Sequence, residues 1–124
     1  MSHLDSIYQV FVPTDFSKDS RNAMRTALEV VSKHNSSLTM AYVIEPIYNF
    51  ASEVQKITEQ LEQKANERFD EIISEAVKKG VEKDRLNGVV LHGKVTVSLL
   101  QEIERRDPDL VVMGSKGQTG LKKV

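Results

Sequence analysis

The sequence has no cysteine, no long apolar run and no excess of either charge. Without cysteine the chain can form no disulfide, no thiolate zinc site and no cysteine nucleophile. No apolar run approaches the roughly 20 residues that a membrane-spanning helix needs, so we expect no membrane insertion. Seventeen basic residues against eighteen acidic ones give a net charge of −1. This balance offers no electrostatic reason to expect a nucleic-acid partner.

The N-terminal residues also lack a targeting pattern. Residues 1–6 contain neither a basic nor an apolar region, so we expect no signal peptide and a cytoplasmic protein. With 124 residues, 40% of them hydrophobic and 28% charged, the chain has the length and composition of one globular domain.

Several catalytic motifs are missing as well. There is no G-x-x-x-x-G-K-[ST] phosphate loop, no G-x-G-x-x-G after the first expected strand and no G-x-S-x-G nucleophile elbow. His3, His34 and His92 are scattered and have no metal-ligand spacing. We interpret His92 as a strand-end residue, and we expect a protein without catalytic machinery and without a metal site of its own.

Apolar and β-branched runs predict four strands. The first run covers residues 7–12 and is closed by Pro13, and the second covers 38–44. Residues 86–91 and 109–113 form two further runs of the same kind. Because these runs are nearly continuous in apolar side chains, they are typical of strands buried on both faces of a sheet.

Helical spacing fills the segments between these strands. Ser17 is a good N-cap for a first helix that ends near His34. Residues 52–55 match a capping box at the start of a long helix, which Gly80 ends as a C′ residue. Apolar residues at helical spacing predict a third helix that ends near Arg106.

The resulting order is β-α-β-α-β-α-β. Buried strands joined by helices imply an open parallel sheet with helices on both faces and right-handed crossovers. Residues 1–124 contain no internal repeat and no interdomain linker. We therefore predict a single α/β domain.

Two strand ends could carry chemistry. Asp15 lies in the turn Val12-Pro13-Thr14-Asp15-Phe16-Ser17, where a carboxylate can meet a ligand's sugar or base. Turn chemistry is the competing interpretation, because Asp and Ser often satisfy local backbone groups in such turns. The loop Gly114-Ser115-Lys116-Gly117 follows the last strand, and its backbone N–H groups could point at a phosphate.

These segments resemble the universal stress protein family. The resemblance is carried by residues 12–17, by Ala41-Tyr42-Val43-Ile44, and by Asp109-Leu110-Val111-Val112-Met113-Gly114-Ser115-Lys116-Gly117. It covers essentially the whole chain in the family's order and spacing. It implies an adenine nucleotide α-hydrolase-like fold with sheet order 3-2-1-4-5 and, in one branch of the family, bound ATP.

The resemblance also implies roles for particular residues. Asp15 with its neighbours would line the adenosine pocket, and the Val43 backbone would read the adenine edge. Met113 and Gly114 would lie beside the ribose, while Gly117 would let the loop approach the phosphates. The full set of implied nucleotide-binding residues is Pro13, Thr14, Asp15, Val43, Met113, Gly114, Ser115, Lys116 and Gly117.

The second half of the family's nucleotide motif would begin at position 127, beyond Val124. We therefore expect a domain that is incomplete at its C-terminus, with order 3-2-1-4 and the fifth strand missing. ATP binding would then be weakened or lost. The outer edge of the last strand, residues 109–113, would be bare, and we expect the chain to form homo-oligomers through it.

Three functions remain open at this point. The first is a non-catalytic, ATP-binding stress-response regulator, in which the loop's backbone N–H groups hold the phosphates and Mg²⁺ neutralises them. The second is a protein-interaction module of the same fold that binds no nucleotide. The third is a phosphoacceptor receiver-like domain using Asp15, which fares worst because Thr14 occupies the place of the further acidic residue that receivers need.

Overall fold

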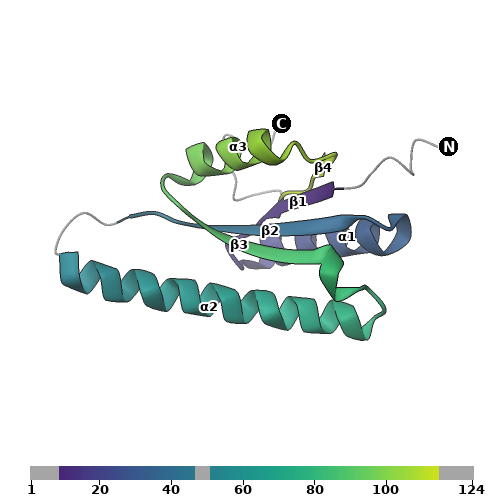
Figure 1. Ribbon diagram of the computed structural model, residues 1–124, viewed down its shortest axis with the longest axis horizontal. Helices are drawn as coiled ribbons and strands as arrows, with labels where there is room; N and C mark the ends of the chain where they lie inside the picture. Colours follow the sequence, from purple (N-terminus) through teal and green to yellow (C-terminus); the bar gives the residue numbers. More distant parts are fainter. Residues whose placement is uncertain (1–8, 47–50, 115–124) are drawn as a thin grey trace.

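Strands and helices alternate along the chain, which a computed structural model describes over residues 9–46 and 51–114 (Figure 1). The strands are β1 (Gln9–Pro13), β2 (Ser37–Ile44), β3 (Leu86–His92) and β4 (Leu110–Val111). The helices are α1 (Lys18–His34), α2 (Ala51–Lys78) and α3 (Val95–Arg106), and a short 3-10 helix, η2 (Lys83–Arg85), precedes β3. This order confirms the predicted β-α-β-α-β-α-β pattern.

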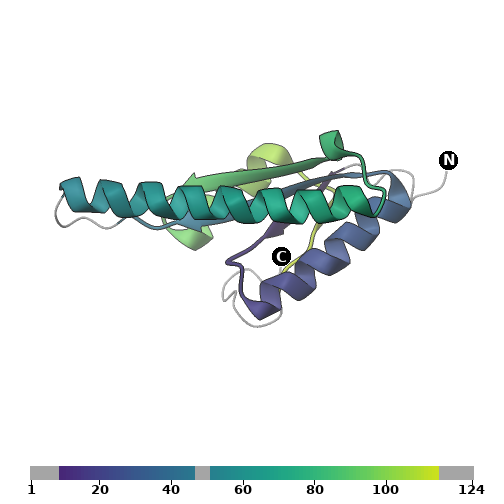
Figure 2. The same ribbon diagram turned by 90° about the horizontal axis from the view of Figure 1, so that it is seen from below.

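The strands form one parallel sheet in the order β3-β2-β1-β4. Figure 1 and Figure 2 show α1 and α2 together on one face of the sheet and α3 on the other. The predicted open parallel sheet with helices on both faces is therefore confirmed. Because β1, β2 and β4 run in one direction, their carboxyl ends meet at one edge of the sheet, where α/β proteins bind ligands.

Two strand boundaries differ from the predicted ones. Pro13 is the last residue of β1, opposite Ala41 of β2, whereas the predicted run ended one residue earlier, at Val12. The last strand is shorter than predicted, because β4 covers two residues of the range 109–113. At its start the Asp109 side chain replaces a backbone carbonyl, since Asp109 Oδ2 accepts the Gln9 N–H at 2.9 Å.

The predicted helix ends are partly confirmed. Ser17 caps α1, with its Oγ accepting the Ser20 N–H at 3.3 Å, and Asn35 ends the helix in the left-handed conformation. Gly80 follows α2 with φ +104°, as a C′ glycine should. The predicted capping box is wrong in its placement, because α2 begins at Ala51 and Ser52 already lies inside the helix.

Apolar side chains pack in two layers, one on each face of the sheet. On the α1 and α2 face, Val10 and Val12 of β1 pack with Phe69 of α2 and other buried residues. On the α3 face a smaller cluster joins Phe11 and Ala41 of the sheet to Leu99 of α3. The alternation of β1 side chains between these two layers is what a strand covered on both faces requires.

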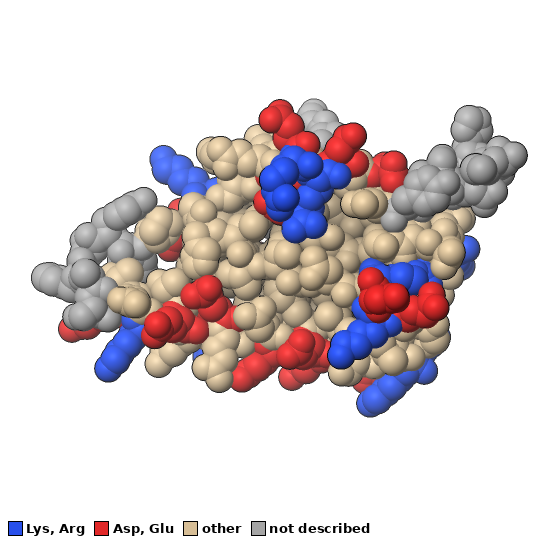
Figure 3. Space-filling view, in the orientation of Figure 1, with Lys and Arg blue, Asp and Glu red and all other residues tan. Residues whose placement is uncertain are grey.

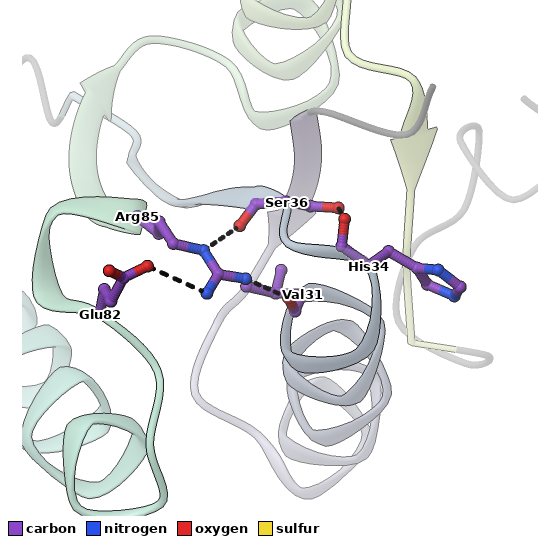
Figure 4. A network of polar contacts seen from close by, with 5 residues as sticks. All are labelled: Val31, His34, Ser36, Glu82 and Arg85. Carbon is purple, nitrogen blue, oxygen red and sulfur yellow. Dashed lines mark hydrogen bonds and ion pairs between the residues drawn. The ribbon is translucent and has the colours of Figure 1, made fainter. Parts of the chain in front are cut away.

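An arginine ties η2 to the end of α1 (Figure 4). Arg85 Nε donates to the Ser36 carbonyl at 2.9 Å, and its Nη2 donates to the Val31 carbonyl. Its Nη1 lies 3.6 Å from a carboxylate oxygen of Glu82. A cation at a helix C-terminus also interacts favourably with the helix dipole. Arg85 thus joins two elements that are far apart in the sequence.

The surface carries both charges. Figure 3 shows acidic and basic side chains interspersed, with an uncharged band between those over α3 and those over α2.

Among the described residues, β4 pairs with β1 and no strand covers its other edge. Homo-oligomerisation through that edge stays a prediction. No helix within the described ranges is both long and apolar enough to cross a bilayer.

Candidate functional site

The turn after β1 is held by its own side chains. The Thr14 N–H donates to the Ala41 carbonyl at 2.8 Å and so continues the sheet's hydrogen bonding past Pro13. Thr14 Oγ1 accepts the Phe16 N–H at 3.0 Å, and Asp15 Oδ1 accepts the Ser17 N–H at 2.9 Å. These local bonds fix the turn at the carboxyl edge of the sheet.

Asp15 is the central side chain of this turn. The Ser20 hydroxyl donates to Asp15 Oδ1 at 2.5 Å, and the Asp15 N–H donates to Ser20 Oγ at 3.2 Å. Burial raises the pKa of Asp15, but hydrogen bonds from Ser17 and Ser20 outweigh it and hold the pKa below its usual value. The carboxylate is therefore charged at neutral pH. No described residue hydrogen-bonds its Oδ2, and the side chain is exposed.

Turn chemistry thus accounts for one carboxylate oxygen and leaves the other available. Oδ1 accepts the local hydrogen bonds that the competing interpretation assigned to Asp15. Oδ2 is an acceptor at the carboxyl edge of the sheet with no partner among the described residues, so both interpretations of Asp15 can hold together.

Phe16 adopts a backbone conformation that non-glycine residues rarely occupy, with φ 63°. Its ring lies 5.1 Å from that of Tyr42 and 5.4 Å from that of Phe69, measured between centroids. The Arg68 guanidinium sits over the Phe16 ring at 5.3 Å. Such local strain costs about 1–3 kcal/mol and persists where the surroundings impose it, which is frequent at functional sites.

A crevice of about 60 Å³ opens at the carboxyl ends of the strands. Five of the predicted site residues meet there: Pro13, Thr14, Asp15, Val43 and Gly114. Met113 instead packs with the apolar cluster on the α3 face. Ser115, Lys116 and Gly117 lie outside the described residues.

Gly114 brings the end of the last strand close to the start of α1. A Cβ at this position would lie 3.2 Å from the backbone carbon and oxygen of Asp19, which is tighter than ordinary contact. Glycine therefore lets the chain after β4 approach the first turn of α1 beside Asp15. Asp15 and Gly114, which are far apart in the sequence, therefore line the same crevice.

Sequence reasoning missed the other half of the lining: Ser20, Ala41, Tyr42, Val95 and Leu99. Ser20 had a usable signal, since it lies three residues after the helix cap at Ser17 and could face the turn. No feature of the sequence assigns Val95 and Leu99 to the crevice, because their helical spacing indicates that α3 has a buried face without indicating what that face contacts.

His92 is a strand-end residue, as predicted. Its Nε2 lies 3.3 Å from a carboxylate oxygen of Glu62 on α2, and its backbone carbonyl is 3.5 Å from the Ser98 hydroxyl. Within the described ranges, no group of three His, Cys, Asp or Glu side chains could hold a metal ion.

Comparison with known proteins agrees with this arrangement. The model of the universal stress protein family matches residues 8–124. The chain belongs to the universal stress protein family. The match covers both halves of the crevice, namely the turn after β1 and the chain after β4.

Two proteins that are similar in sequence differ in length. Universal stress protein MJ0531 from Methanocaldococcus jannaschii is 25% identical over 97% of this chain and 72% of its own length. Uncharacterized protein C167.05 from Schizosaccharomyces pombe is 29% identical over 92% of this chain. The chain spans only 19% of that larger protein.

Solved structures show the same fold. Universal stress protein UspA from Lactobacillus plantarum superposes with a TM-score of 0.75 at 17% identity, over 95% of this chain and 83% of that one. Hypothetical protein MJ0577 gives 0.76 at 20% identity, over 95% and 81%. A universal stress protein solved in complex with cAMP gives 0.67 at 21% identity, over 92% and 80%.

Proposed function

We propose that this protein is a non-catalytic stress-response regulator that binds ATP or a related adenine nucleotide at the crevice. The observation that carries the proposal is the meeting of Asp15, Val43 and Gly114 at the carboxyl edge of the parallel sheet. The relative solved with cAMP, which also contains adenosine, is consistent with this ligand class.

The residues present fit the adenosine part of such a ligand. Asp15 Oδ2 would accept a hydrogen bond from a ribose hydroxyl, and the backbone of Val43 would face the adenine edge. Gly114 would let the sugar approach the main chain closely. The crevice holds about 60 Å³, well below the ~300–1,000 Å³ of most small-molecule sites. It would therefore enclose only part of the ligand, with the phosphates reaching toward Gly117.

Mg²⁺ fits less well among the described residues. Asp15 is the one carboxylate that lines the crevice, and no cluster of three ligating side chains exists in the described ranges. Magnesium commonly keeps several waters and binds through substrate phosphates, so the phosphates would have to supply its ligands. We propose binding without turnover, since the sequence contains none of the catalytic motifs named above.

The alternative is a protein-interaction module of the same fold that binds no nucleotide. The small crevice and the local hydrogen bonds of Asp15 Oδ1 favour this reading. Release of adenine nucleotide from the purified, denatured protein separates the two functions. Retained nucleotide would contradict the nucleotide-free interaction module. A protein that is purified without nucleotide and also fails to bind added ATP would contradict the nucleotide-binding proposal.

Replacing Asp15 by alanine should weaken ATP and adenosine binding alike, by about 10-fold or more, because the lost hydrogen bond is charge-assisted and does not involve phosphate. Calorimetric titration with both ligands measures this. Asp84→Ala, an exposed carboxylate in η2 outside the crevice, is the matched control and should bind normally. A loss confined to ATP would place Asp15 on the phosphate side. Unchanged affinity for both ligands would mean that Asp15 only stabilises the turn and does not contact the ligand.

Gly117→Val should weaken ATP binding while leaving adenosine binding and the circular dichroism spectrum unchanged. The added Cβ and its branches would occupy space that the resemblance assigns to the phosphates. Titration of wild type and variant with ATP and with adenosine tests this. Equal ATP affinities would remove Gly117 from the site.

A further inference from the structure

A second and larger cavity is also lined by residues of the turn after β1, namely Thr14 and Phe16. It opens between α1 and α2 and holds about 390 Å³, within the ~300–1,000 Å³ typical of small-molecule sites. Figure 2 shows these two helices on the same face of the sheet, with α1 running obliquely to α2. The cavity is lined by Thr14, Phe16, Arg21, Met24, Arg25, Leu28, Arg68, Glu71, Ile72, Glu75 and Lys79.

The floor of this cavity is apolar. Met24 is buried, and Phe16, Leu28 and Ile72 are partly buried against the main core. A polar nucleotide would leave this apolar surface in contact with water, whereas an alkyl or aromatic group would bury it. The floor therefore selects a different class of ligand from the crevice at the sheet edge.

The α1 wall carries two arginines one helical turn apart, Arg21 and Arg25. Arg25 Nη1 contacts Asn22 Oδ1 at 3.3 Å, and within the described ranges neither arginine forms an ion pair. Like charges four residues apart on a helix repel each other. An anion placed between the two guanidinium groups would remove this repulsion.

The α2 wall does not neutralise the α1 wall. Glu71 already lies 3.6 Å from Arg68 Nε, and the Arg68 guanidinium also covers the Phe16 ring. Glu75 is the remaining acidic side chain in the lining, and Lys79 is a further cation. Four cations against two carboxylates give the lining a net charge of +2, although the whole chain has −1.

We propose that this cavity is a second binding site, for an amphipathic organic anion. The apolar body lies on the floor formed by Phe16, Leu28 and Ile72, and its carboxylate lies between Arg21 and Arg25. Thr14 lines both this cavity and the crevice, so the two sites share one wall. The inference goes beyond the proposed nucleotide function and does not depend on it.

Titration of the purified protein with octanoate, 1-octanol and acetate tests the proposal. Octanoate carries both an alkyl chain and a carboxylate. Octanol has the alkyl chain without the carboxylate, and acetate has the carboxylate without the long alkyl chain. Octanoate should bind at least about 10-fold more tightly than either of the others, since affinity needs both the buried chain and the charge-assisted contact. The double variant Arg21→Gln/Arg25→Gln should reduce octanoate affinity to that of octanol.

The matched control is Lys33→Gln/Lys83→Gln, which removes the same charge from exposed positions outside the cavity and should bind octanoate like wild type. Equal binding of octanoate and octanol, or an unaffected arginine variant, would overturn the proposal. So would an absence of saturable octanoate binding. Competitive displacement of octanoate by ATP, together with loss of octanoate binding in Asp15→Ala, would place octanoate in the crevice and also overturn it.

Discussion

Replacing Gly88 by alanine should destabilise the protein by about 1–3 kcal/mol, the usual cost of overpacking a core. Gly88 lies in β3 directly beneath Phe69 of α2. A Cβ there would lie 2.4 Å from Phe69 Cγ and 2.5 Å from Cδ2. Phe69 is 2% exposed, so its ring has little room to move. Either α2 must shift away from the sheet or the ring must leave its position.

A double-mutant cycle separates this clash from a general effect of alanine in β3. Phe69→Ala alone should cost about 3–5 kcal/mol by leaving a cavity. In that background Gly88→Ala should cost clearly less, because the ring atoms at 2.4 and 2.5 Å are gone and only the Cβ of residue 69, at 2.9 Å, stays close to the new methyl group. Urea unfolding followed by circular dichroism gives all four stabilities. Asn87→Ala, at an exposed neighbour in the same strand, should stay within about ±0.5 kcal/mol. An equal cost of Gly88→Ala with and without the ring would show that the Phe69 ring is not the obstacle.

Replacing Arg85 by alanine should cost about 2 kcal/mol, because one side chain supplies charge-assisted hydrogen bonds to two backbone carbonyls (Figure 4). The Val31 carbonyl keeps the N–H groups of Asn35 and Ser36 as donors, which limits the loss. The packing of the partly buried arginine stem adds to it. Urea unfolding measures the change.

Two further variants show which property of Arg85 matters. Arg85→Lys should recover only part of the loss, since an ammonium cannot reproduce the planar fork of donors that reaches both carbonyls. Glu82→Gln should change stability by no more than about 1 kcal/mol, because this carboxylate is 71% exposed and surface ion pairs contribute little. A lysine variant as stable as wild type would mean that the charge alone suffices. A large loss of stability in Glu82→Gln would mean that the ion pair with Glu82, and not the hydrogen bonds to the carbonyls, supplies most of the stabilisation.

Local signals in the sequence were sufficient for most elements of the fold. The cap at Ser17 and the glycine at position 80 act within one helical turn, so their neighbours in sequence decide them. The apolar runs of the strands depend only on burial, and they predicted the parallel sheet correctly. The placement of Ser52 failed because the helix begins at Ala51, and a capping pattern fixes a helix start only to within a residue or two.

The candidate site was predictable in part for the same reason. Asp15 and Gly114 follow strands, and the carboxyl ends of parallel strands must meet at one edge. The family resemblance added Val43, and the match to residues 8–124 shows the family. What Asp15 does with each of its oxygens depended on the orientation of Ser20, which spacing could indicate but not fix.

The sequence by itself determined the order of the elements, the direction of the strands and the two segments that meet at the crevice, because these follow from local periodicity and from chain connectivity. Tertiary structure alone decided which surfaces touch. It brought Val95 and Leu99 to the crevice and Gly88 against Phe69. It also placed Arg85 within hydrogen-bonding distance of the Ser36 and Val31 carbonyls, which are 49 and 54 residues away in the sequence. It also set Arg21 and Arg25 over an apolar floor. Such contacts depend on how helices pack across the sheet, and helical spacing specifies the buried face of a helix without specifying its neighbour.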